Sequence, residues 1–166
     1  MPVKRFLVYS FIFTSILGTF LHFTYELSGN NAIVSTFSSI NESVWEHLKL
    51  LYFPMLITTL FGSYYYRKEI SNFLCSKTIG IIVSMIFTVI FFYTYSGILG
   101  TKLTVVDVLS FYIAAFLGEY VSYRMMKKPL KCNNSTAIIV LAILLICFII
   151  FTFKIPNLGI FENPVA

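Results

Sequence analysis

Charged side chains are scarce in this chain: Asp, Glu, Lys and Arg make up only 11% of its 166 residues, whereas 58% are hydrophobic. An average soluble domain carries roughly 25% charged residues. The core of a 166-residue domain cannot bury so much apolar surface. The composition therefore predicts an integral membrane protein, with the lipid bilayer as its expected partner. The net charge of +5 is then a signal of membrane orientation, and nucleic-acid binding is not expected.

Cysteine and histidine are also rare. The three cysteines, Cys75, Cys132 and Cys147, form no CxxC pair, and the chain has only two histidines. A zinc finger needs closely spaced pairs of these ligands, so the sequence excludes that class of site.

Long apolar runs, by contrast, are abundant. Five of them occupy residues 6–23, 48–66, 78–95, 105–123 and 136–153. Each approaches the roughly 20 residues that a helix needs to cross a bilayer, and none fits a membrane-barrel strand of about 10 alternating residues. The sequence therefore predicts a single all-α domain of five transmembrane helices, with a short tail over residues 154–166.

The distribution of Lys and Arg predicts the orientation of these helices. A cytoplasmic N-terminus places nine of the twelve basic residues in the cytoplasm and leaves three outside, namely Lys49, Lys102 and Lys154. Because cytoplasmic loops are enriched in basic residues, the C-terminus is expected to be extracytoplasmic. The abundance of Ile, Phe, Tyr, Lys and Asn is typical of an AT-rich bacterial genome, so the plasma membrane of a bacterium is the expected location.

Most of the remaining acid–base side chains gather at the predicted outer face. His22 and Glu26 are four residues apart and share one face at the end of the first apolar run. Glu42, Glu46 and His47 come just before the second run, after a loop short enough to bring the two helix ends together. We therefore expect a pocket that binds a metal ion or a small ligand and is formed by His22, Glu26, Glu42, Ser43, Glu46 and His47.

Imidazole and carboxylate groups suit a divalent metal such as zinc, and the candidate ligands are His22, Glu26, Glu46 and His47. The same groups suit proton transfer, since histidine titrates near neutral pH. The spacing matches no strong motif, and HExxH is absent. Ser43-x-x-x-His47 is similar to one element of membrane hydrolases with Ser, His and Asp around a zinc ion, so hydrolysis is one activity that the pocket could carry. Whether the chain is an enzyme stays open.

A purely structural interpretation covers part of this pattern. Ser39-x-x-Glu42 matches a capping box, with Asn41 as an alternative cap, and acids suit the positive end of a helix dipole. This accounts for Glu42 and only partly for Glu46, and it leaves His47 unexplained. Pro54 is expected to bend the second helix and to make room for a pocket beneath the polar residues.

Two more acids lie in the fourth apolar run. Asp107 is expected in the cap region at its outer end, and Glu119 lies about 18 Å further along the helix, near the cytoplasmic interface. An acid at that depth is costly unless paired and marks function by default; the alternative is a salt bridge to Arg124 or snorkelling.

Asp107 and Glu119 are candidates for a proton path. They support an alternative function, a small transporter or channel subunit that uses proton or cation coupling. A third alternative is a structural or interaction protein whose tail docks a partner. Protein partners, a homo-oligomer among them, stay open.

Three segments carry a family resemblance. They are Asn41-Glu-Ser-Val-Trp-Glu-His-Leu-Lys-Leu50, the region of His22-Phe-Thr-Tyr-Glu26 with Gly29-Asn30, and the tail from Phe153-Lys-Ile-Pro156 through Phe161-Glu-Asn-Pro164. The chain resembles an uncharacterised family of small bacterial multi-pass membrane proteins, a domain of unknown function, in which the first segment is the hallmark. The resemblance implies the topology and brings no activity, cofactor or partner.

Overall fold

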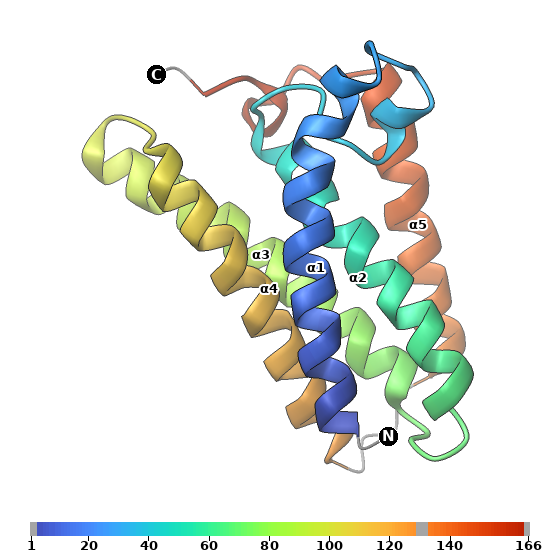
Figure 1. Ribbon diagram of the computed structural model, residues 1–166. Coiled ribbons are helices and arrows are strands. Elements are labelled where there is room, and N and C mark those ends of the chain that lie inside the picture. Colours follow the sequence, from blue (N-terminus) through green and yellow to red (C-terminus); the bar gives the residue numbers. More distant parts are fainter. Residues whose placement is uncertain (1–2, 129–132, 165–166) are drawn as a thin grey trace.

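The computed structural model describes residues 3–128 and 133–164, which form an all-helical bundle (Figure 1). Two 3-10 helices, η1 (Val34–Thr36) and η2 (Gly159–Phe161), follow α1 and α5. The prediction of an all-α fold is confirmed. The five α-helices are α1 (Val3–Leu27), α2 (Val44–Tyr66), α3 (Phe73–Leu99), α4 (Thr104–Met126) and α5 (Asn134–Phe153).

All five helices start earlier than the apolar runs that predicted them, and three also end later. α2 begins four residues before its run because Ser43 caps it, with the Glu46 N–H donating to the Ser43 hydroxyl at 3.4 Å. α3 continues to Leu99 and ends at Gly100, whose left-handed backbone (φ +72°) favours glycine. Hydrophobicity marks only the part of a helix that suits a membrane, whereas capping residues decide where the helix ends.

Four of the helices, α1, α3, α4 and α5, are long and apolar enough to cross a membrane. α2 is not among them: Glu46, His47 and Lys49 lie close to its start, and three tyrosines lie at its end. α2 is instead the most buried helix, with 13 of its 23 residues inside the protein. Its polar side chains therefore face other helices and loops.

Small residues bring α3 and α4 into close contact. A Cβ atom added at Gly80 would lie 2.3 Å from the carbonyl oxygen of Gly118, so only glycine fits there. Small residues at such crossings let membrane helices approach closely. Between this contact and the loop that connects α3 to α4, the hairpin diverges from α1, as Figure 1 shows.

α1 and α2 cross at a site shaped by a proline. α2 runs through Pro54 as one helix, but proline has no N–H to donate to the carbonyl of Leu50. Gly18 of α1 lies against that carbonyl, and a Cβ atom at Gly18 would be 2.5 Å from its oxygen. The bend expected at Pro54 stays a prediction; what the structure shows is that α1 packs against the turn that Pro54 leaves without a hydrogen bond.

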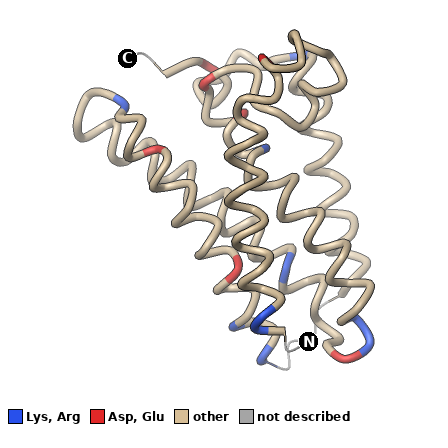
Figure 2. Tube along the Cα trace, viewed as in Figure 1, with Lys and Arg blue, Asp and Glu red and all other residues tan. Residues whose placement is uncertain are grey.

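Charge divides the bundle into two ends (Figure 2). We call the end formed by residues 28–43, 100–103 and 154–164 the site end and the other the basic end. Lys49 and Lys77 have no exposed surface. Of the other basic residues in the described chain, Lys102 and Lys154 lie at the site end, and seven lie at the basic end: Lys4, Arg5, Arg67, Lys68, Arg124, Lys127 and Lys128.

Candidate metal centre and adjoining cavity

Two histidines and one glutamate converge at the site end. The Nε2 atom of His22 on α1 lies 3.5 Å from one carboxylate oxygen of Glu42, and the Nε2 atom of His47 on α2 lies 3.8 Å from the other. The centroids of the two imidazole rings are 5.3 Å apart. One ligand atom from each residue lies within 4.8 Å of the other two, a spacing that could hold a single metal ion.

The orientation of His47 explains what this cluster requires. Its Nδ1 atom lies 2.8 Å from the backbone oxygen of Ser43. A carbonyl only accepts, so Nδ1 carries the proton, and in a neutral ring Nε2 then carries a lone pair. That lone pair faces the Glu42 carboxylate, and two electron-rich groups repel one another unless a proton, a water molecule or a metal ion lies between them. Of these three, a metal ion is the one that both histidines and Glu42 could bind together.

Hydrogen bonds from both sides hold Glu42 in place. Its backbone N–H donates to the side-chain oxygen of Asn163 at 3.1 Å, and the next N–H, of Ser43, donates to Asn41 at 2.9 Å. The C-terminal segment is itself anchored, because Phe161 is buried and its ring lies 4.9 Å from that of Trp45. The tail thus folds back onto the site end and positions the glutamate.

A buried lysine fastens the loop that precedes α2. The ammonium group of Lys49 donates to the Glu46 carboxylate at 2.7 Å, to the Ser35 carbonyl at 2.9 Å and to the Thr152 hydroxyl at 2.6 Å. These three bonds use all its donors. The same carboxylate oxygen of Glu46 accepts the N–H of Ile40 at 3.0 Å. Loop, α2 and α5 therefore meet at one ion pair.

A second attachment ties the loop to α1. The Ser38 hydroxyl donates to the carbonyl of Leu21 and accepts the N–H of Tyr25 at 3.0 Å. These two α1 residues lie on either side of His22. The loop therefore brings Glu42 toward the histidine of α1 as well as toward that of α2.

The structure brings together only part of the predicted ligand set. His22 and His47 meet as expected, but the carboxylate between them belongs to Glu42. Glu46 points to Lys49, since neighbouring helical residues face directions about 100° apart. Glu26 is exposed and forms no ion pair within the described chain.

The predicted cap is also corrected. Ser43 caps α2, so Glu42 precedes the helix, and the capping box expected at Ser39 and Glu42 is wrong. The hydroxyl of Ser39 instead donates to the backbone oxygen of Asn41 at 2.6 Å. Ser43 supports the cluster twice, through its hydroxyl as the cap and through its carbonyl as the partner of His47.

A cavity of about 150 Å³ adjoins the cluster and extends between α1, α2, α3 and α4. Lys102 and Asp107 join its lining, and neither was predicted to meet the histidines. Asp107 lies in the first turn of α4 and accepts a hydrogen bond from the Tyr95 hydroxyl. The rest of the wall is mainly apolar, with Phe23, Val44, Leu50, Leu51, Phe92, Val108 and Phe111 among its side chains.

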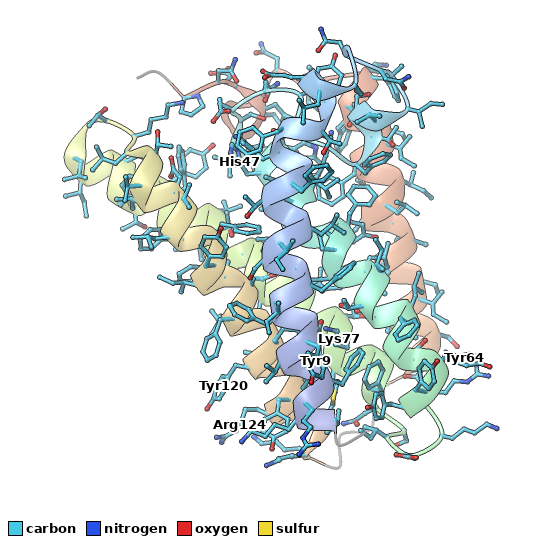
Figure 3. The ribbon with its side chains drawn as sticks, viewed as in Figure 1. Tyr9, His47, Tyr64, Lys77, Tyr120 and Arg124 are labelled. Carbon is cyan, nitrogen blue, oxygen red and sulfur yellow. The ribbon has the colours of Figure 1, made fainter. Side chains whose placement is uncertain are left out.

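Glu119 belongs to a separate polar cluster in the half nearer the basic end. Its carboxylate lies 2.5 Å from the ammonium group of Lys77 and accepts the Ser10 hydroxyl at 2.6 Å. Figure 3 shows Lys77 in this half, well away from His47. The alternative salt bridge to Arg124 is wrong, since the guanidinium of Arg124 donates to the Tyr120 hydroxyl at 3.3 Å. Lys77 comes immediately before the apolar run 78–95, and this position is the sequence signal that it lies inside a helix.

These features define an all-helical protein with helices compatible with a membrane and a histidine–carboxylate cluster at one end. The whole chain, residues 1–166, matches the model of a family of unknown function, DUF6512, and the chain belongs to that family. No curated protein and no solved structure matches it. The expectation of an uncharacterised family is confirmed, whereas its bacterial range and its hallmark segment stay predictions.

The Lys49 ion pair yields a stability prediction. Lys49→Met leaves the Glu46 carboxylate buried without its cation and should cost about 3–5 kcal/mol of unfolding free energy. The double variant Glu46→Gln/Lys49→Met removes both charges and should recover most of that loss. The measurement is thermal unfolding in detergent, with the exposed Lys154→Met as control. Equal unfolding temperatures for Lys49→Met and Lys154→Met would contradict the proposed role of the ion pair.

Proposed function

We propose that this chain is a multi-pass membrane protein that binds a divalent transition metal, zinc in the first place, through His22, Glu42 and His47. The observation that carries the proposal is the His47 ring, whose Nδ1 proton is fixed by the Ser43 carbonyl while Nε2 faces a carboxylate. Metal-binding histidines commonly donate their second ring N–H to a backbone carbonyl in this way. Two imidazole nitrogens and a carboxylate oxygen are ordinary zinc ligands.

Three protein ligands leave a coordination position free. Catalytic zinc sites have this composition, and the free position holds water or substrate. The cavity beside the cluster supplies room for a ligand, and Glu42 is 55% exposed, so an ion can arrive from water. Hydrolysis of a bound ligand is the reaction that such an arrangement supports best.

The proposal includes five membrane-crossing helices, with the site end outside the cell. α2 crosses within the shelter of the other helices, which its burial supports. Once the buried Lys49 and Lys77 are set aside, seven basic residues at the basic end face two at the site end. This asymmetry supports a cytoplasmic N-terminus, as the positive-inside rule requires.

Labelling of single cysteines in intact cells tests this orientation. A cysteine at the exposed Asn157 should react with a membrane-impermeant maleimide, and one at the exposed Lys127 should react only after the membrane is opened. The parent chain gives the background from its own cysteines. The reverse pattern of labelling would invert the topology and place the metal site in the cytoplasm.

Zinc binding tests the proposed ligands. Purified protein should bind about one zinc ion per chain in competition with a chromogenic chelator. His22→Ala, Glu42→Gln and His47→Ala should each weaken binding more than about 100-fold, beyond the 10–100-fold effect typical of outer-shell partners. Affinity should also fall at acid pH, because imidazole must lose its proton to bind a metal.

Glu26→Gln is the matched control, since Glu26 lies one turn beyond His22 and forms no ion pair in the described chain. It should keep zinc affinity within a factor of about two. A large loss in Glu26→Gln would return Glu26 to the ligand set. Unchanged zinc affinity in all three ligand variants would refute the metal site and leave a proton-bridged histidine pair.

Proton or cation transport is the second candidate, and one stripe of α1 favours it. Ser10, Thr14, Gly18 and His22 follow at intervals of four, so they share a helix face that leads from the Glu119 cluster to the histidines. The Thr14 hydroxyl and one Glu119 oxygen are buried with no hydrogen-bond partner in the described chain. Ionisable side chains inside a membrane commonly mark proton relays, and Glu119 is such a side chain.

Reconstituted liposomes separate the two candidates. Under transport, vesicles containing the protein should take up protons along a pH gradient, and Glu119→Gln should abolish the flux. Glu162→Gln, at an exposed tail position, is the control and should leave the flux unchanged. Vesicles as tight as those without protein would exclude transport without affecting the metal site.

A further inference from the structure

We propose that the cavity beside the cluster binds a phosphodiester lipid. The phosphate of this lipid contacts the metal ion and Lys102, and the adjacent apolar part of the lipid packs against α1 and α4. This inference rests on the proposed metal site and assigns its ligand class. Two observations carry it, the apolar wall and the half-exposed lining side chains on the outer surface of the bundle. The charge that a bound metal ion would leave at the polar end supports it further.

We infer an opening of the cavity between α1 and α4 from side chains that line it and also lie on the outer surface of the bundle. Thr19 of α1 contacts Tyr112 of α4 in the cavity wall, and their hydroxyl groups are 3.0 Å apart. Above this contact Phe23 of α1 and Val108 of α4 both line the cavity, and both are about half exposed, at 52% and 49%. In a membrane these exposed surfaces meet acyl chains, so a lipid can reach the cavity without leaving the bilayer.

With a divalent ion bound, the polar end of the cavity would have one positive charge that is not balanced by a carboxylate. A divalent ion and Lys102 bring three positive charges, and Glu42 and Asp107 bring two negative charges. The histidines bind a metal as neutral rings. A phosphodiester carries a single negative charge and therefore balances the site. Lys102 forms no ion pair within the described residues, so its ammonium group is available to a phosphate oxygen.

The size of the cavity limits which part of the lipid it holds. A volume of about 150 Å³ matches an apolar cavity that holds one benzene molecule. Only the part of a lipid next to its phosphate fits inside, and the chains must continue into the bilayer through the opening between α1 and α4. Free phosphate would occupy the polar end and leave the apolar wall exposed to water, which is unfavourable.

The test uses zinc-loaded full-length protein in detergent and short-chain phosphatidylglycerol with a fluorescent label on one chain. Unlabelled competitors separate the two parts of the ligand. Phosphatidylglycerol should displace the probe, whereas diacylglycerol, which has no phosphate, and glycerophosphoglycerol, the same phosphodiester without chains, should each compete at least about tenfold less well, since either lacks a contact worth about 1.4 kcal/mol or more.

Two pairs of variants locate the site. Val108→Trp should fill the opening and weaken probe binding about tenfold, whereas Val105→Trp, on the same helix and outside the cavity lining, should have no effect. Lys102→Gln should weaken binding about tenfold through the loss of a charge-assisted hydrogen bond. Lys154→Gln, an exposed lysine at the same end, should not.

Zinc content is measured in every sample, so the two proposals can fail separately. Zinc without probe binding, or probe binding that Val108→Trp and Lys102→Gln leave unchanged, overturns the lipid site and leaves the metal site standing. Equal competition by glycerophosphoglycerol identifies a site for soluble phosphodiesters, and equal competition by diacylglycerol identifies an apolar site; both overturn the inference. Protein that binds no zinc refutes the proposed function, and with it the charge balance on which the lipid site depends.

Discussion

The architecture of the site end depends on one buried ammonium group. Lys49 has no exposed surface, and its three donors are satisfied by α2, by the loop before α2 and by α5. A buried charge is tolerated only when such partners are present, so the three segments are held in one arrangement. Since Glu42 lies in that loop, two residues after Ile40, the ion pair fixes where the carboxylate meets the histidines.

The described residues form two buried lysine–glutamate pairs, and they differ in what they connect. Through Lys49, the first pair joins the loop before α2, α2 and α5, and one oxygen of Glu46 accepts hydrogen bonds from both Lys49 and Ile40. Glu119 pairs with Lys77 and keeps one buried oxygen without a hydrogen bond. The first pair therefore has the character of a structural joint. In the second pair, one oxygen of Glu119 is free to accept a hydrogen bond from water or to take up a proton, and this property favours the transport alternative.

Close helix packing and the cavity are two consequences of the same hairpin geometry. Gly80 and Gly118 draw α3 and α4 together, and Gly18 admits α1 to the carbonyl that Pro54 leaves free on α2. Beyond these contacts the α3–α4 hairpin leans away toward the site end (Figure 1), and the cavity lies there beside His22 and His47. Tight contacts in one half thus leave room for a ligand in the other.

Hydropathy alone determined the helical class and the approximate place of each helix, because bilayer-length apolar runs leave few other structures open to the chain. Local spacing also suggested that His22 and His47 would meet. Only the tertiary structure decided which carboxylate joins them. Glu46 is next to His47 in sequence but pairs with Lys49, whereas the backbone of Glu42 is held by Asn163 from the far end of the chain. Such long-range hydrogen bonds, like that of Lys77 with Glu119, leave no periodic signal in a sequence, since they depend on how separate elements pack.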